Sequence, residues 1–333
     1  VFESGMSAIS TVMMEFLNPG DYILYSNPTY GGTYHFVKNV LSRFGINAIA
    51  FHAHEPEAKI DEIIREHGIG DKLKMIYVET PANPTNQLVD IEACRKVADR
   101  LCTPEKHVYL AVDNTYMGPL WQHPLKHGAD LVLYSATKYI GGHSDLIAGA
   151  VMGRQELMTR VKTLRTFLGN MISPNTAWLL LRSLETLKLR MDKQCDNAQK
   201  VAAFLLENEK VEKVYYLGLL HPEEQGYDIY QKQCEGPGAM ISFDIVGGEK
   251  EAFEFLNALK LIKLAVSLGS TESLVQHPMT MTHAGVDPEH RKKINITEKM
   301  IRISVGVENA EDIINDIKQA FKAVSKKKEL SLN

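Results

Sequence analysis

The sequence predicts an α/β protein: a large, mainly parallel sheet covered by helices, followed by a smaller α+β domain. Three observations predict this fold. Short apolar runs alternate with helical patterns between residues 22 and 134. A long helical stretch follows from residue 173 to 208, and beyond it longer loops separate the strands. We therefore expect a large domain over residues 1–195 and a small domain over residues 196–333.

Length and composition are those of an ordinary globular protein. The 333 residues are 44% hydrophobic and 23% charged, which favours neither disorder nor a membrane protein. The formal net charge is −4, and the one long basic run, Lys326–Lys328, lies in the C-terminal tail. This charge gives no reason to expect binding to nucleic acid or to an anionic membrane.

The cysteines are widely spaced and form no Cys-x-x-Cys pair: Cys94, Cys102, Cys195 and Cys234. This spacing indicates neither a disulfide framework nor a zinc site, so a reducing, cytoplasmic setting fits best. No stretch is apolar enough for long enough to span a bilayer. The chain begins at Val1 in the middle of domain-like sequence, so we expect a natural segment upstream, with any targeting signal.

The first predicted element is a helix that begins with small residues. Ser4-Gly5-Met6 opens an apolar helical pattern, which ends at Asn18-Pro19-Gly20. Free backbone N–H groups at such a terminus can bind a phosphate, although a capped helix without a ligand is commoner. Gly5 and Met6 are candidate phosphate donors on this basis.

Strands and helices then alternate. The predicted strands are Tyr22–Ser26, Ile46–Phe51, Lys74–Glu79, Val108–Val112, Leu131–Tyr134 and Ile147–Met152. The helices between them are Tyr30 to about Phe44, Pro56–His67 and Ile91–Leu101. Such units form a parallel sheet that binds ligands beyond the carboxyl ends of its strands. Tyr30 lies at one strand-to-helix junction.

Unusual polar residues follow the ends of three predicted strands. They are Glu79–Asn83, Asp113–Thr115 and Ser135–Lys138. Any one set is explained more simply by turn formers and helix caps. Because the carboxyl ends of parallel strands meet at one edge, we expect the three sets to converge on one crevice.

The C-terminal domain has a different pattern. Its predicted strands are Val214–Tyr216, Ala239–Ile245, Ile262–Val266 and Ile301–Val305, and its helices are Lys250–Leu259 and Ala310–Val324. A long polar loop, Gln276–Thr297, carries His277, His283 and His290. These histidines lack a compact ligand spacing with carboxylates or cysteines, so we expect a lid or wall and no metal site.

Lys138 is the single cation at the end of a buried strand. An isolated lysine is usually a solvated surface charge. Here Ser135 and Thr137 precede it, so the segment has the parts to form an imine with an aldehyde cofactor and to hold a phosphate. This combination points to pyridoxal 5′-phosphate (PLP).

PLP requires an amine, an anion at the ring nitrogen, and donors for its phosphate. The sequence offers a candidate for each requirement. They are Lys138 as the amine, Asp113 with Thr115 beside it as the anion, Gly5, Met6, Ser135 and Thr137 for the phosphate, Asn83 for the ring hydroxyl, and Tyr30 as an aromatic lid.

Arg302 lies inside the apolar strand Ile301–Val305, where a charge is unfavourable unless it is paired. A bidentate grip on a substrate carboxylate would explain the position. A structural salt bridge is the alternative explanation.

Several segments, in order, resemble the Cys/Met metabolism family of PLP enzymes: SGMSAI, YGGT, ETPANPT, VDNTYMGP, YSATKYIGGHSD, AVSLGSTESLVQHP, MTMTH and IRISVGVE. The resemblance covers nearly the whole chain. It implies the aspartate-aminotransferase-like fold (fold type I), a homotetramer of dimers that share active sites, and the roles given to Lys138, Asp113, Tyr30 and Arg302. It links Tyr30 to proton movement and adds Ser267 as a contact to the substrate carboxylate. It also implies an upstream segment whose tyrosine and arginine reach the neighbour's cofactor phosphate.

Val266 and Gly32 bear on which reaction is catalysed. Cystathionine-handling members typically have glutamate at the Val266 position, whereas methionine γ-lyases and some sulfhydrylases resemble this chain in having an apolar residue. Strand packing alone would also explain Val266. His277-Pro278 resembles the methionine γ-lyases, but Gly32 resembles cystathionine γ-lyase and γ-synthase, because many methionine γ-lyases have cysteine there.

The resulting hypothesis is γ-elimination from methionine or cystathionine, giving 2-oxobutanoate, ammonia and a thiol, with Lys138 as the base. A γ-replacement transferase, cystathionine γ-synthase or O-acylhomoserine sulfhydrylase, is the alternative. A non-catalytic scaffold is a remote third.

Overall fold

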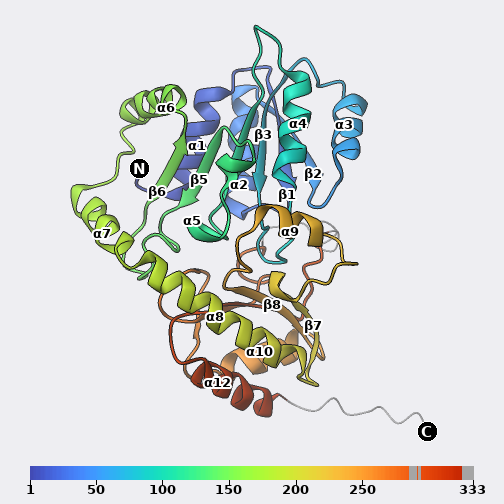
Figure 1. The fold of residues 1–333 in the computed structure, drawn as a ribbon, viewed down its shortest axis with the longest axis vertical. Helices are drawn as coiled ribbons and strands as arrows, with labels where there is room; N and C mark the ends of the chain where they lie inside the picture. Colours follow the sequence, from blue (N-terminus) through green and yellow to red (C-terminus); the bar gives the residue numbers. More distant parts are fainter. Residues whose placement is uncertain (285–290, 292–293, 325–333) are drawn as a thin grey trace. The chain divides into compact units, whose positions relative to one another are not determined.

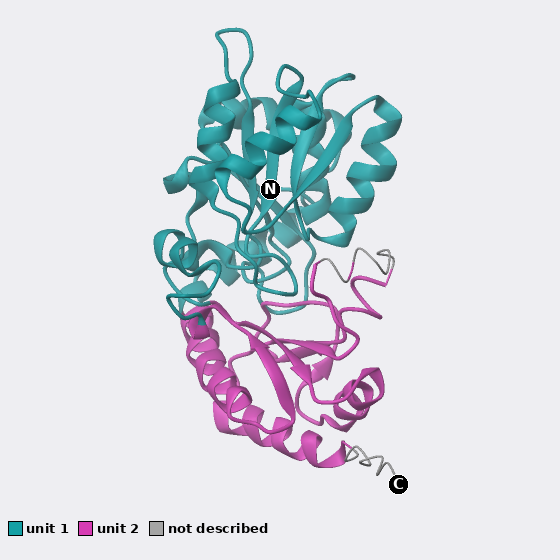
Figure 2. Ribbon diagram, turned by 90° about the vertical axis from the view of Figure 1, so that its right-hand side faces the viewer, with its two compact units in different colours: residues 1–188, 220–237 teal, residues 189–219, 238–333 magenta. Residues whose placement is uncertain are grey.

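The computed structural model describes residues 1–284, 291 and 294–324. The chain forms two compact units (Figure 2). Unit 1 comprises Val1–Lys188 and Leu220–Pro237, and unit 2 comprises Leu189–Leu219 and Gly238–Asn333. No pattern in the sequence indicated that residues 220–237 belong with the first unit.

A six-stranded sheet forms the middle of unit 1, in the order β2-β1-β3-β4-β5-β6 (Figure 1). All neighbouring strands are parallel except β5 and β6. The mainly parallel sheet is therefore confirmed. The strands are β1 (Tyr22–Asn27), β2 (Asn47–His52), β3 (Leu73–Glu79), β4 (Tyr109–Asp113), β5 (Leu131–Ser135) and β6 (Gly149–Gly153).

Helices cover both faces of this sheet, because successive strand residues point to opposite faces. Ile76 and Val78 pack in one buried cluster with α3 and α4, whereas Met75 and Tyr77 pack in another with α1 and α6. The helices of unit 1 include α1 (Gly5–Phe16), α2 (Gly31–His35), α3 (Glu57–Glu66), α4 (Ile91–Leu101), α5 (Gly118–Trp121), α6 (Gln155–Leu168), α7 (Pro174–Leu184) and α9 (Tyr227–Gln233).

The predicted single helix from Tyr30 to Phe44 is not continuous. It consists of α2, a π turn at Phe36–Val40 and a 3₁₀ turn at Leu41–Phe44. Gly45 ends the last turn with a φ of 71°, a left-handed conformation that favours glycine.

Buried amide side chains fix α9 to unit 1. Gln233 is 2% exposed, and its Nε2 donates to the Val89 carbonyl (3.0 Å) and to Gln122 Oε1 (3.1 Å). Its Oε1 accepts the Ile91 N–H at 3.2 Å. A buried amide with several partners specifies one docking position, which explains why a segment late in the chain joins the first unit.

Unit 2 contains a five-stranded sheet in the order β7-β8-β11-β10-β9, antiparallel except between β10 and β9. The predicted strand Ile262–Val266 is reduced to two residues, and the three-residue strand β10 was missed because it is too short to show a period. The strands are β7 (Val211–Tyr215), β8 (Met240–Ile245), β9 (Lys263–Leu264), β10 (Leu274–Gln276) and β11 (Met300–Ser304); the helices include α8 (Leu187–Leu206), which starts in unit 1, α10 (Glu249–Ala258) and α12 (Ala310–Ala323).

The first residues of the chain pair with the outermost strand of the unit 1 sheet. Phe2 donates to the Gly149 carbonyl at 2.8 Å and accepts the Gly149 N–H at 2.9 Å. A Cβ at Gly149 would lie 2.1 Å from the Ser4 carbonyl oxygen, so only glycine allows this approach. The pairing fixes the residues that lead into α1.

Within the described part of the chain, none of the helices has both the length and the apolar character needed to cross a membrane.

Candidate functional site

Three sets of polar residues meet at the carboxyl edge of the unit 1 sheet. Glu79 and Asp113 are partners in the register of β3 and β4, and Asn114 donates its N–H to the Leu133 carbonyl of β5 at 3.0 Å. The Ser135 N–H donates to Thr115 Oγ1 at 2.8 Å. The structure therefore brings together the residues that the sequence suggested would converge.

Asp113 is a buried carboxylate at the centre of this edge, with 6% of its surface exposed. Its Oδ1 accepts the Thr115 N–H at 3.0 Å, and its Oδ2 accepts from the Tyr77 hydroxyl at 3.2 Å. Burial raises the pKa of Asp113, while the bonds from Thr115 and Tyr77 act in the opposite direction. A cation near Asp113 would relieve this burial penalty, which is the environment expected for the anion at a protonated ring nitrogen.

Tyr77 is a member of this site that the sequence did not reveal. It lies inside the apolar strand β3 and is fully buried. Burial, and after it the negative charge of Asp113, raise the pKa of Tyr77 well above its ordinary value. The phenol therefore stays protonated and donates to Asp113. Within an apolar run, nothing in the sequence distinguished Tyr77 from a core aromatic residue.

The N-terminus of α1 lies against Ser135. The Ser4 hydroxyl caps the helix by accepting the Ser7 N–H at 3.0 Å, and the Ser4 carbonyl accepts the Ala8 N–H. The first N–H groups of a helix have no partner inside it, so those of Gly5 and Met6 remain available for an anion. A Cβ at Gly5 would lie 2.9 Å from the Ser135 Cβ, so this contact requires glycine. Gly5, Met6 and Ser135 thus form a small cradle with the donors that a phosphate needs.

Thr137 lies beside this cradle but already has backbone partners. Its hydroxyl donates to the Ala148 carbonyl at 3.2 Å and accepts the Ala148 N–H at 3.0 Å. These bonds fix the turn that follows β5.

Lys138 is half-buried in the same turn. Its N–H donates to the Ser135 carbonyl at 3.0 Å, and its carbonyl accepts the Gly142 N–H at 2.7 Å. Gly142 has a φ of 70°. The backbone of Lys138 is therefore fixed at both ends, next to Ser135.

Tyr30 lies next to the start of α1. A Cβ at Gly32 would lie 2.6 Å from Cε1 of Tyr30 and 3.0 Å from Sδ of Met6, so the ring and the Met6 side chain meet over this glycine. Tyr30 is 46% exposed, as an aromatic lid would be, whereas Asn83 is 6% exposed. Tyr30 therefore borders the Gly5–Ser135 cradle, and Asn83 lies in the loop after β3.

The candidate substrate-binding residues lie together in unit 2. Arg302 is 1% exposed in β11, and its Nη2 donates to the carbonyls of Ser267 (2.8 Å) and Val266 (3.3 Å). Val266 is 54% exposed and lies beyond the end of β9. Strand packing, the simpler explanation of Val266, is therefore wrong.

The histidines of the polar loop have structural partners. His277 Nδ1 lies 2.8 Å from Thr280 Oγ1, and Nε2 lies 2.8 Å from the Glu298 carbonyl oxygen. His283 is buried near Thr282, and His290 lies outside the described residues. Over residues 1–284, 291 and 294–324, no group of three or more His, Cys, Asp or Glu side chains could hold a metal ion.

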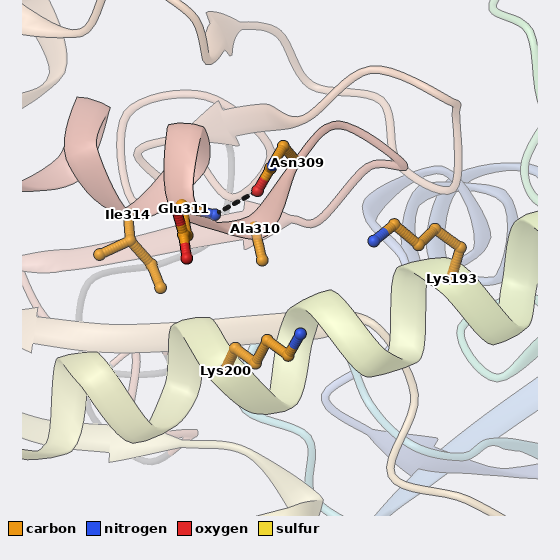
Figure 3. Close-up of a pocket in the computed structure, with 6 residues that line it drawn as sticks. All are labelled: Lys193, Lys200, Asn309, Ala310, Glu311 and Ile314. Atoms are coloured by element: carbon orange, nitrogen blue, oxygen red, sulfur yellow. Dashed lines mark hydrogen bonds between the residues drawn. The ribbon is translucent and has the colours of Figure 1, made fainter.

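A separate pocket of about 690 Å³ lies in unit 2 between α8 and α12 (Figure 3). Asn309 already caps α12 by accepting the Glu311 N–H at 2.9 Å. None of the candidate residues lines this pocket, so we assign it no role. Its lining residues are Lys193, Lys200, Asn309, Ala310, Glu311 and Ile314.

Comparison with known proteins agrees with this chemistry. The chain is 41% identical over 324 residues to the L-methionine γ-lyase of Fusobacterium nucleatum subsp. nucleatum, covering 96% of this chain and 79% of that protein. It is 42% identical over 325 residues to the cystathionine γ-lyase of Bacillus subtilis (strain 168), covering 97% and 82%. The crystal structure of cystathionine γ-synthase from Xanthomonas oryzae pv. oryzae, in complex with aminoacrylate and cysteine, matches with a TM-score of 0.89 and 34% identity, covering 97% and 80%.

The predicted fold type and the predicted cofactor are both confirmed by these relatives and by a family model that matches residues 1–322. The chain belongs to the family of Cys/Met metabolism PLP-dependent enzymes.

Proposed function

We propose that this enzyme catalyses γ-elimination from a sulfur amino acid, with methionine as the preferred substrate and cystathionine as the next. The products are 2-oxobutanoate, ammonia and a thiol. The observation that carries the proposal is the meeting of Lys138, Asp113 and the Gly5–Ser135 cradle at one edge of the sheet. PLP, when bound, supplies an aldehyde carbon that takes up an amine and a ring that withdraws electrons.

Each residue at this edge has a separate task. Gly5, Met6 and Ser135 bind the phosphate, and Thr137 joins them by exchanging its 3.2 Å bond to Ala148 for a phosphate oxygen. Asp113 holds the proton on the ring nitrogen, and Thr115 fixes the Asp113 carboxylate. Asn83 donates to the ring hydroxyl, and Tyr30 covers the ring.

Lys138 first holds the cofactor and then acts as the base. Once free, its amine would accept the proton from the substrate's Cα and, after passing that proton on, the proton from Cβ. Tyr30 assists the movement of a proton toward the departing sulfur. The Tyr30 ring borders the cradle at Met6, and the backbone of Lys138 bonds to Ser135 in the cradle.

Arg302 and Ser267 hold the carboxylate of the substrate. The guanidinium bonds to the backbone at Val266 and Ser267, which fixes its orientation in unit 2. The exposed apolar side chain of Val266 suits a short thioether such as methionine better than a substrate with a second charged end.

Incubation with methionine alone tests this proposal. We expect release of 2-oxobutanoate, ammonia and a thiol in equal amounts, and no release from Lys138→Ala. Absence of release from methionine and cystathionine, together with thioether formation from an O-acylhomoserine and a thiol, would make the enzyme a transferase.

A γ-replacement transferase is the second candidate, and Gly32 is compatible with it, as it is with a cystathionine γ-lyase. A side chain at this position would meet the Tyr30 ring, so the cysteine of many methionine γ-lyases does not fit the ring position found here. The Xanthomonas structure, a cystathionine γ-synthase, shares the fold at 34% identity. Comparing rates on methionine, cystathionine and O-acylhomoserine separates the two candidates.

We further propose that the chain forms a homotetramer, a dimer of dimers that share active sites, in the cytoplasm. Exposed apolar side chains of α6, α7 and the loop between them support self-association, because such patches mark interfaces. They are Phe167, Leu168, Met171, Trp178, Leu181 and Leu184. The four free cysteines support the reducing location.

Light scattering tests the assembly. The double substitution Trp178→Asp and Leu181→Asp should yield a smaller species, whereas Leu125→Asp, which changes an exposed leucine outside the α6–α7 patch, should not. An unchanged mass for the double variant would remove α6 and α7 from the interface.

A further inference from the structure

Glu79 is a buried carboxyl group to which the proposed mechanism gives no task. It is the last residue of β3, stands opposite Asp113 in the parallel register, and is 6% exposed. Its N–H donates to the Ser26 hydroxyl of β1 at 2.9 Å. Two negative charges on adjacent strand ends, both out of water, would be unfavourable, so one of the two carboxyl groups is expected to be neutral.

The side chain of Glu79 holds the junction that carries Tyr30. Its Oε2 accepts the Tyr30 N–H at 2.6 Å and the Thr29 hydroxyl at 3.1 Å. Its Oε1 lies 3.5 Å from the Asn83 N–H. One carboxyl group therefore connects the segment between β1 and α2 to the loop after β3, which carries another cofactor candidate.

Tyr30 depends on this support. It occupies the N-cap position of α2, a five-residue helix, and makes no side-chain cap of its own. Its carbonyl accepts the Tyr34 N–H, but its ring is 46% exposed. The short bond from the Tyr30 N–H to Glu79 thus fixes the backbone of Tyr30 to the sheet.

Of the two buried carboxyl groups, Glu79 and Asp113, Glu79 is the one we assign as protonated. Burial first, and then the charge of Asp113 from β4, raise the pKa of Glu79 from 4.5 to about 8. The other groups facing it are Tyr77 on β3 and the donors of Thr29, Tyr30 and Asn83. One neutral and one negative carboxyl can then lie side by side.

We propose that Glu79 is a positioning residue: as a neutral carboxyl group it ties the Tyr30 backbone to the sheet edge and leaves the negative charge to Asp113. The proposal rests on the roles of Tyr30 and Asp113 given under the proposed function. Glutamine reproduces a neutral carboxyl group, with one acceptor and one donor, whereas alanine removes both.

Hydrogen–deuterium exchange of the segment Thr29–Tyr34 tests the anchor directly, with and without PLP. In Glu79→Ala the Tyr30 amide should exchange about tenfold faster or more, because its partner is lost. Glu79→Gln should restore exchange to within about threefold of wild type, as expected for a retained acceptor. Glu66→Gln, an exposed site, is the matched control. If Glu79→Ala does not fold, Glu79→Asp, too short by one methylene, replaces it.

Turnover supplies a second readout. Glu79→Ala should lower kcat with little change in KM, and Glu79→Gln should restore kcat. In the double variant with Tyr30→Phe, Glu79→Ala should lower kcat no further than Tyr30→Phe alone does. Unchanged exchange in Glu79→Ala, or a Glu79→Gln variant as impaired as Glu79→Ala, would overturn the proposal. A wild-type enzyme without activity on sulfur amino acids would instead refute the proposed function, while the exchange data would still decide the role of Glu79.

Discussion

The candidate residues of the two units lie in different sheets and were found by different reasoning. In unit 1 they follow the ends of parallel strands, and the common direction of those strands brings Glu79, Asp113 and Ser135 to one edge. In unit 2 the sheet is mostly antiparallel, so chain order does not say which strand ends meet. Arg302 was recognised there because a charge interrupts an apolar strand.

The two sheets differ in how an error in a predicted strand end affects the prediction of functional residues. In unit 1 a strand predicted one or two residues too long still delivers its polar residues to the correct edge. In unit 2 the strand β9 ends two residues earlier than predicted, so Val266, expected as the last residue of that strand, lies beyond it in an exposed position.

Removal of Lys138 is the largest expected effect, and it tests the unit 1 edge. Lys138→Ala should lower turnover of methionine by about 10⁴-fold or more, because both the cofactor anchor and the base are lost. The visible absorbance of the lysine-bound cofactor should disappear with it. Lys96→Ala, on the exposed side of α4, is the control. Retained activity in Lys138→Ala would refute the assignment of this edge.

Arg302 tests unit 2 in the same way. Arg302→Lys keeps the charge but loses the planar fork, so KM for methionine should rise by about 10- to 100-fold with a smaller change in kcat. Circular dichroism checks that the buried site still folds. An unchanged KM would mean that Arg302 serves the backbone of Val266 and Ser267 and no substrate.

The cradle at the start of α1 gives an intermediate effect. In Gly5→Ala the added methyl group would lie 2.9 Å from the Ser135 Cβ, so PLP affinity should fall by about tenfold or more. Gly70→Ala, where the nearest atom is 3.7 Å away, should bind PLP like the wild type. Equal affinities in a PLP titration of the two variants would remove Gly5 from the phosphate site.

The pH dependence of stability concerns the two carboxyl groups of unit 1. The pKa of Glu79 rises on folding from 4.5 to about 8, so between these values the folded state binds more protons than the unfolded state. This contribution to stability is complete below pH 4.5 and is lost as the pH rises toward 8. The free energy of unfolding should fall by on the order of 2–4 kcal/mol over this range and fall less in Glu79→Gln. The free energy of unfolding can be measured by urea titration at each pH. If it changes with pH equally in the wild type and in Glu79→Gln, the assignment to Glu79 is wrong.

Most of the unit 1 architecture, and the convergence of the candidate residues at its sheet edge, could be predicted. The period of the strands, the turn residues at their ends and the parallel connections all indicate the same arrangement. The Tyr77 hydroxyl could not be predicted, since an aromatic residue in an apolar strand looks the same whether or not it donates to Asp113. The docking of α9 could not be predicted either. It depends on Gln233 finding partners more than a hundred residues away, and local patterns carry no such information.

The pairing of Phe2 with Gly149 has a consequence for solubility. The outer edge of β6 would otherwise present open backbone donors and acceptors, which invite a strand from another molecule. Phe2 occupies that edge at Gly149 and forms a further bridge with Met171. The residues that lead into α1 therefore also protect the sheet against edge-to-edge aggregation. The added methyl group of Gly149→Ala would weaken both the placement of the residues that lead into α1 and the protection of the β6 edge.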